Sequence, residues 1–220
     1  MFEKYMENNC HVQSSVKVIE ECFSRYNHDP DTFCISFNGG KDCTVLLHLT
    51  HMVMKRNRLD FRLKSLHITI ADTFCQLVEF VTESYRRYNL DTIEIEGPNF
   101  KTALVELKNS HPKMDGILMG TRRSDISYQL GYFERTDQDW PDFMRVNPIL
   151  DWSYRDVWDY LVNLQVPYCK LYDYGYTSIG STKNTRLNPR LKRSDESGQT
   201  FYLPAFSLED PSDERFGRIS

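Results

Sequence analysis

The sequence has 220 residues, of which 40% are hydrophobic and 26% are charged, as in a globular protein with a sizeable core. Its net charge of −4 argues against a nucleic-acid-binding surface. No apolar run approaches the roughly 18 residues of a membrane span, and the N-terminus lacks the apolar region of a signal peptide. We therefore expect a single domain over residues 1–220, located in the cytoplasm, with neither nucleic acid nor a membrane as partner.

Helices and strands are expected to alternate along the first half of the chain. Apolar residues at helical spacing predict a helix over 12–26, and the short apolar run at 33–37 predicts a buried strand. Thr73 and Gln76 resemble a capping box that opens a later helix. Further strands are expected at 63–70, 92–96 and 116–120, and further helices at 45–53, 77–88 and 100–107. This order predicts an α/β fold with a mostly parallel sheet covered by helices on both faces.

The turn after the first strand, residues 36–44, has the residue types of a phosphate-binding loop. Gly39 and Gly40 let a phosphate approach the backbone, and the N-terminus of the helix that follows favours an anion. Lys41 adds a positive charge, and Asp42 can hold a metal ion or orient the turn. The loop is neither a Walker A motif nor a dinucleotide fingerprint, but it resembles the pyrophosphate loop of ATP pyrophosphatases. An ordinary turn with solvated charges is the alternative.

Ligands of a parallel sheet bind beyond the carboxyl ends of its strands, which selects residues 38–42, 70–72 and 121–125. In the last of these, Arg122 and Asp125 suit phosphate and Mg²⁺, although surface arginines in a loop are often only solvated. The segment 126–143 has neither helical nor strand periodicity and is rich in aromatic residues, so we expect a long functional loop. Its rings can stack on a planar heterocycle, or they can simply cover the sheet edge.

The last third of the sequence contains a helix and a polar tail. Ser153 and Asp156 form a capping box that predicts a helix over 157–164. The chain becomes polar after Pro189, and the tail over residues 191–220 would ordinarily be frayed at its end.

Four segments, residues 36–42, 120–125, 135–141 and 175–181, occur together and in one order. Together they closely resemble the eukaryotic FAD synthases, the FMN adenylyltransferases of the phosphoadenylylsulfate-reductase-like family, and the match runs from about residue 33 to residue 189. The resemblance implies a Rossmann-like adenine-nucleotide α-hydrolase fold with a core over about 12–190. It also implies the reaction of ATP with FMN to give FAD and pyrophosphate, with Mg²⁺ as cofactor and with client flavoproteins as candidate partners.

The resemblance also assigns roles to individual residues. Those expected to be catalytic are Asn38, Lys41, Asp42 and Asp125, and Mg²⁺ is expected on Asp42 and Asp125. The residues expected to bind ATP, FMN or FAD are Ile35, Ser36, Phe37, Gly39, Gly40, Ile70, Asp72, Gly120, Arg122, Asp137, Gln138, Asp139, Trp140, Arg215 and Arg218. Residues 137–140 would surround the isoalloxazine ring. The two tail arginines would reach the flavin phosphate and the pyrophosphate as residues 191–220 close over the site.

Sulfonucleotide reductases of the same family carry cysteines where this chain has Ser181 and Asn184, and no cysteine follows Cys169. Neither thiolate chemistry nor an iron–sulfur cluster is therefore expected. The six cysteines contain no C-x-x-C pair, and reduced, buried thiols are expected. The chain is expected to be the synthase module alone. Two alternatives stay open: another ATP-dependent adenylylating enzyme with a pyrophosphate loop, and a flavin- or nucleotide-binding module without turnover.

Overall fold

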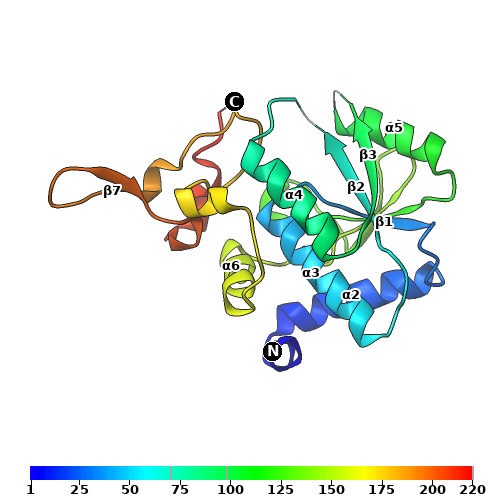
Figure 1. Cartoon of the computed structure of the whole chain (residues 1–220). Coiled ribbons are helices and arrows are strands. Elements are labelled where there is room, and N and C mark those ends of the chain that lie inside the picture. The colour runs from blue at the N-terminus through cyan, green and yellow to red at the C-terminus, as the bar shows by residue number, and fades with distance from the viewer. Residues whose placement is uncertain (70, 98, 220) are drawn as a thin grey trace.

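The computed structural model describes residues 1–69, 71–97 and 99–219, so Ile70, which was assigned to the site, lies outside the described residues. Six strands of the described residues form one sheet in the order β3-β2-β1-β4-β6-β5, of which β3, β2 and β1 are labelled in Figure 1. Their bounds are Phe33–Ser36 (β1), Lys64–Thr69 (β2), Asp91–Glu96 (β3), Gly116–Leu118 (β4), Phe133–Arg135 (β5) and Met144–Val146 (β6). All neighbours pair in parallel except β5, which runs antiparallel to β6. The predicted α/β class with a mostly parallel sheet is confirmed.

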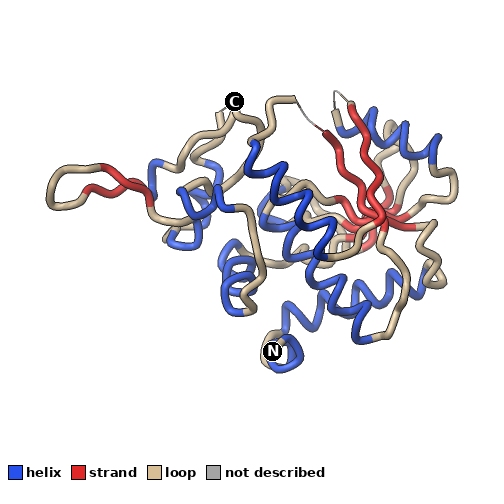
Figure 2. Tube along the Cα trace, viewed as in Figure 1, coloured by secondary structure: helices blue, strands red, loops and turns tan. Residues whose placement is uncertain are grey.

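Helices cover both faces of this sheet (Figures 1 and 2). The helices are α1 (Phe2–Glu7), α2 (Cys10–Arg25), α3 (Lys41–Arg56), α4 (Cys75–Arg87), α5 (Phe100–Ser110) and α6 (Tyr154–Asn163). Successive side chains of a strand point to opposite faces. Accordingly, Phe33 and Ile35 of β1 join the core formed with α2, α3 and α4, whereas Cys34 joins the smaller core under α5. No helix among the described residues is long and apolar enough to cross a bilayer.

Two local predictions were wrong. Residues 126–143 are not a single loop, because β5 forms a hairpin with β6 at the sheet edge. The sequence did not reveal this strand because it has only three residues, of which Glu134 and Arg135 are exposed. The capping box at Thr73 and Gln76 is not formed either. Helix α4 begins at Cys75 with Phe74 as its N-cap, which places Gln76 one position too early. The box at Ser153 and Asp156 is formed as predicted.

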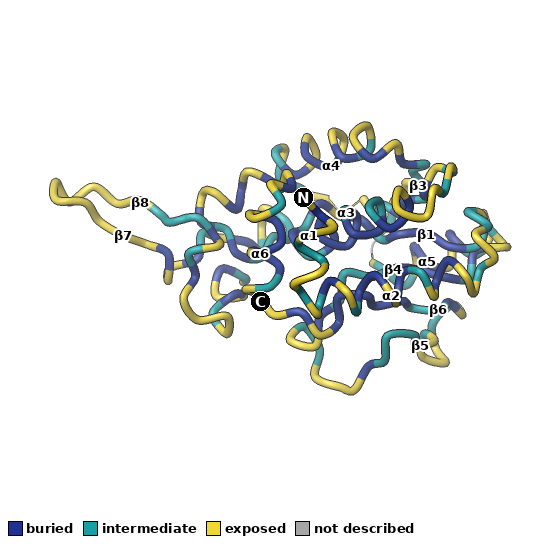
Figure 3. Tube along the Cα trace, turned by 90° about the horizontal axis from the view of Figure 1, so that it is seen from below, coloured by how far each residue is buried: buried dark blue, intermediate teal, exposed yellow. Residues whose placement is uncertain are grey.

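The chain after α6 forms short helical turns and a hairpin of β7 (Lys192–Ser194) and β8 (Thr200–Tyr202). This hairpin projects from the body and is largely exposed (Figures 1 and 3). The residues beyond it return to the sheet end and are not frayed. Arg186 N donates to Gly217 O at 2.8 Å, and Ile219 N donates to Asn184 O at 2.9 Å. The C-terminal segment is thereby paired with the chain around residue 185.

Candidate nucleotide-binding site

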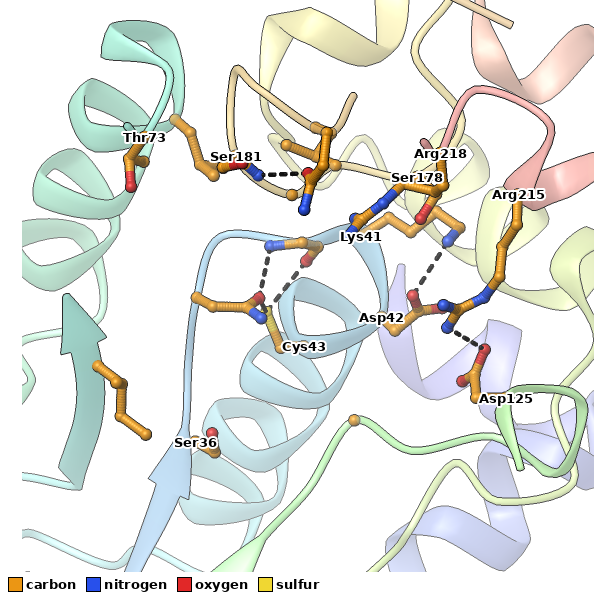
Figure 4. A pocket seen from close by; sticks show the side chains of 18 of the residues that line it. Ser36, Lys41, Asp42, Cys43, Thr73, Asp125, Ser178, Ser181, Arg215 and Arg218 are labelled. Carbon is orange, nitrogen blue, oxygen red and sulfur yellow. Dashed lines mark hydrogen bonds and ion pairs between the residues drawn. The ribbon is translucent and has the colours of Figure 1, made fainter. Parts of the chain in front are cut away.

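A cavity of about 670 Å³ lies at the carboxyl ends of β1, β2 and β4 (Figure 4). The predicted site residues that line it are Ser36, Asn38, Gly40, Lys41, Asp42, Asp72, Gly120, Asp125, Arg215 and Arg218. They come from four separate parts of the chain, and the fold brings them together. In Figure 4, Arg215 and Arg218 reach the cavity from the tail with Ser178 beside Arg218, and Ser181 lies on the other side, toward Thr73.

Two glycines near the cavity, Gly39 and Gly120, allow the backbone to pack closely against its neighbours. Gly39 has a φ of +78°, a conformation that favours glycine, and a Cβ there would lie 2.7 Å from Val81 and 2.8 Å from Leu77 of α4. At Gly120, just after β4, a Cβ would lie 2.9 Å from the backbone N of Cys43. Both positions therefore fix how the start of α3 sits between α4 and the end of β4.

Polar contacts hold the shape of the loop itself. Asn38 Oδ1 accepts hydrogen bonds from Gly40 N at 2.9 Å and from Cys43 Sγ at 3.0 Å. The amide of Lys41, the first residue of α3, donates to the buried Tyr172 hydroxyl at 2.9 Å. Two loop amides thus already have partners inside the protein. The Lys41 side chain adds a cation to the lining of the cavity.

A cluster of charges lies beneath the loop. The buried Lys41 ammonium is 3.0 Å from Asp42 Oδ2 and 2.5 Å from Glu214 Oε1. The Arg122 side chain, only 1% exposed, lies 2.9 Å from Asp42, 3.2 Å from Asp125 and 2.7 Å from Glu214. Burial acts to lower the pKa of Arg122, but the carboxylates of Asp42 and Glu214 outweigh it and raise that pKa. Arg122 is therefore a cation that supports the carboxylates from below, and its side chain does not line the cavity.

Two of these carboxylates, Asp42 and Asp125, could hold a metal ion. Over the described residues, no group of three or more His, Cys, Asp or Glu side chains is placed to hold a metal ion. Asp42 and Asp125 both line the cavity, and the buried Asp42 Oδ1 accepts no hydrogen bond among these residues, although it forms an ion pair with Arg122 Nε at 2.9 Å. Mg²⁺ is commonly held by one or two carboxylates together with substrate phosphates and water. The pair therefore fits Mg²⁺ if a phosphate supplies further ligands.

Other predicted residues lie away from the cavity. Residues 137–140 follow β5, where Asp139 pairs with Lys101 at 3.0 Å and Trp140 packs against Phe100 of α5. The side chains of Ile35 and Phe37 are in the core, so only their main chains could contact a ligand. None of residues 137–140 lines the cavity, but Trp140 belongs to the same hydrophobic cluster as Ile68 and Met119, which do line it.

The sequence reasoning missed Glu214, which contacts both buried cations and lines the cavity. No sequence signal distinguishes it, because it is one of several acidic residues in a polar tail. The segment 178–181 was noticed as a motif but was not assigned to the site. It lines the cavity, and Gly180 lies against the Arg218 guanidinium, which an added Cβ would approach to 2.5 Å.

A loop with two glycines and a lysine thus follows the first strand of a mostly parallel sheet. This arrangement is typical of α/β proteins with a phosphate-binding loop. The family model of the phosphoadenosine phosphosulfate reductase domain matches residues 32–115 and 99–187. A probable FAD synthase of Caenorhabditis briggsae is 40% identical over 210 residues, which are 94% of this chain and 40% of that protein. A probable FAD synthase of Schizosaccharomyces pombe is 39% identical over 212 residues, 93% of this chain and 77% of that protein.

The structure is similar to that of Candida glabrata FMN adenylyltransferase in complex with FMN and the ATP analogue AMPCPP. The TM-score is 0.87 at 26% identity, covering 94% of this chain and 88% of that one. The same Candida enzyme in complex with FAD and inorganic pyrophosphate gives a TM-score of 0.88 at 26% identity, covering 96% and 87%. The chain belongs to the phosphoadenosine phosphosulfate reductase domain family and, within it, to the FAD synthases. It spans about 40% of the length of the Caenorhabditis relative.

Proposed function

We propose that this protein transfers AMP from ATP to the phosphate of FMN, which forms FAD and releases pyrophosphate. The observation that carries the proposal is the cavity at the strand ends, where Lys41, two carboxylates and two tail arginines converge. The similarity over almost the whole chain to an FMN adenylyltransferase solved with both substrates and with both products supports it. The single domain over 1–220, with its tail over the site, would be the catalytic unit.

In this reaction an oxygen of the FMN phosphate attacks the α-phosphorus of ATP, and the bond from that phosphorus to the bridging oxygen breaks. The phosphate of FMN is already an anion at neutral pH, so the step needs no strong general base. Catalysis then depends on alignment and on neutralising the charge of the transition state. Lys41 would hold oxygens of the leaving pyrophosphate, and Asn38 would donate to an α-phosphate oxygen.

Asp42 and Asp125 would hold Mg²⁺, which would reduce the repulsion between the two phosphate-bearing substrates. Arg215 and Arg218 also line the cavity in the described part of the chain, and they would bind the flavin phosphate and the pyrophosphate. The proposed contacts of residues 137–140 with the isoalloxazine ring depend on the sequence resemblance, since these residues lie outside the cavity. A cytoplasmic location and transfer of FAD to client flavoproteins are further parts of this proposal.

The test is to incubate the protein with ATP, Mg²⁺ and FMN and to measure FAD by chromatography and flavin fluorescence. The wild type should form FAD, and Asp42→Asn should lose that activity. Asp60→Asn, an exposed aspartate before β2, is the matched control and should retain it. ATP cleavage with another acceptor but not with FMN would favour a different adenylylating enzyme. Binding of FMN and ATP without any turnover would favour a binding module.

A further inference from the structure

The two buried cations below the cavity are both neutralised by one carboxylate of the C-terminal tail. Glu214 Oε1 lies 2.5 Å from Lys41 Nζ, and its two oxygens accept hydrogen bonds of 2.7 and 2.8 Å from Arg122 Nη2. Glu214 is only 9% exposed, yet it lines the cavity. Its carboxylate therefore occupies the position at which an anion in the cavity would meet Lys41.

The Glu214 carboxylate offsets positive charge at the cavity. Lys41, Arg122 and Arg215 contribute three positive charges to this cluster, and Asp42, Asp125 and Glu214 contribute three negative charges. If the Glu214 carboxylate leaves, a net positive charge remains and the lysine loses its shortest contact. A phosphate offers the same kind of anionic oxygen acceptor that Lys41 and Arg122 now bind in Glu214.

The tail backbone is fixed independently of this carboxylate. The Thr177 hydroxyl donates to the Glu214 carbonyl at 2.6 Å, and Asn188 Nδ2 donates to the Asp213 carbonyl at 2.9 Å. Thr177 and Asn188 are themselves buried and joined by a hydrogen bond of 2.8 Å. A rotation of the Glu214 side chain can therefore free Lys41 while the tail, with Arg215 and Arg218, stays over the cavity.

We propose that the Glu214 carboxylate occupies a phosphate position of the site in the free protein and exchanges with a phosphate group of the bound polyphosphate. It thereby lowers the affinity of the empty site for anions and favours ligands that engage several contacts at once. The proposal deepens the function proposed above and depends on it only in that the ligand carries a polyphosphate.

The test compares Glu214→Gln with the wild type in binding inorganic tripolyphosphate, measured by calorimetry with EDTA present so that no divalent metal takes part. Removing the competing charge from a close buried pair should tighten binding by about tenfold or more. Glu209→Gln is the matched control, since Glu209 is in the same tail but 89% exposed, and its affinity should equal that of the wild type. Unchanged binding by Glu214→Gln would overturn the proposal. Weaker binding would also overturn it, because Glu214 would then serve to hold the two cations in place.

If Glu214→Gln does not fold, Glu214→Asp provides the test, because its carboxylate is one methylene farther from Lys41. Tripolyphosphate should then bind more tightly than to the wild type, and equal affinity would count against the exchange. The outcome is separable from the proposed function. If the wild type makes FAD but neither variant binds tripolyphosphate more tightly, the proposed function stands and the exchange is refuted. If a variant binds tripolyphosphate more tightly but the wild type makes no FAD, the exchange stands and the proposed function is refuted.

Discussion

The hydroxyl of Thr177 donates a hydrogen bond of 2.6 Å to the carbonyl oxygen of Glu214, 37 residues farther along the chain. Asn188 completes the contact, since its amide donates both to Thr177 Oγ1 and to the Asp213 carbonyl. Thr177 and Asn188 are both buried. This buried polar contact is what turns a polar C-terminal segment into a wall of the cavity.

Thr177→Val should loosen this wall. The substitution keeps the shape of the side chain but removes the donor to the Glu214 carbonyl and one of the two acceptors of the Asn188 amide, which should lower the free energy of unfolding by about 1–3 kcal/mol. Hydrogen exchange of the amides of residues 214–219 should become faster, and the KM for FMN should rise. Thr200→Val in the exposed strand β8 is the control. Unchanged exchange in the tail would show that other contacts hold it.

Asn38→Ala should lower turnover by about 10²- to 10³-fold, as expected when a preorganised donor is removed, with a much smaller effect on ATP affinity. Asn38→Asp separates this role from the loop geometry, because it keeps the acceptor for Gly40 N but lacks the amide donor. Steady-state kinetics and ATP titration of both variants provide the measurement. A loss of affinity with unchanged turnover in Asn38→Ala would contradict the donor role. If Asn38→Asp kept full activity, the loss of turnover in Asn38→Ala would come from a change in loop shape.

Gly120→Ala should disturb the phosphate loop, because Gly120 follows β4, the strand beside β1. The new Cβ would lie 2.9 Å from the Cys43 N and 3.1 Å from the Asp42 carbonyl carbon, and backbone atoms cannot rotate away. Such overpacking should reduce stability by about 1–3 kcal/mol and weaken ATP binding, as measured by urea denaturation and titration. In the control Gly131→Ala the nearest atoms, the Glu134 carboxylate and the Phe133 carbonyl oxygen, are both 3.3 Å away, so the overlap is smaller. Equal effects of the two substitutions would refute the argument.

Asp115→Asn should destabilise the protein in a pH-dependent manner. Burial acts to raise the pKa of Asp115, but hydrogen bonds from Arg135 at 2.5 Å and Tyr26 at 2.7 Å outweigh it and hold this pKa below its ordinary value of 3.8. The ionised group therefore stabilises the fold above that value, and the contribution disappears as the pH falls through the lowered pKa. The variant should lose about 1 kcal/mol at pH 7 and much less near pH 2. Urea denaturation of the variant and the wild type at both pH values is the measurement. An equal loss of stability at pH 7 and pH 2 would contradict the prediction.

Alkylation should distinguish two classes of cysteine. Cys10 and Cys75 are exposed, whereas the other four thiols are buried. Burial also raises the pKa to about 12 in Cys22, Cys34 and Cys43. Iodoacetamide at pH 8 should therefore modify Cys10 and Cys75 first, as measured by peptide mass spectrometry, and the buried thiols should react only in denaturant. Rapid reaction of Cys43 in the native protein would contradict its place under the phosphate loop.

Predictability differed between elements for physical reasons. The strands β1 and β2 and the helix α3 bury apolar side chains at regular spacing, and this local pattern predicted them. The edge strand β5 exposes polar side chains and is too short to show an alternation, so only its pairing with β6 defines it. The tail looked frayed because its composition is polar, and its order comes from buried hydrogen bonds to Thr177 and Asn188.

The sequence by itself determined the α/β arrangement, the phosphate-binding type of loop at residues 36–44 and the family, because each depends on patterns within a short stretch of chain or on motifs in a fixed order. Only the tertiary structure decided that Lys41 meets Glu214, 173 residues away, and that Arg122 is buried among carboxylates. Such contacts join charges from distant segments. Their geometry depends on how the whole chain packs, and no local pattern encodes it.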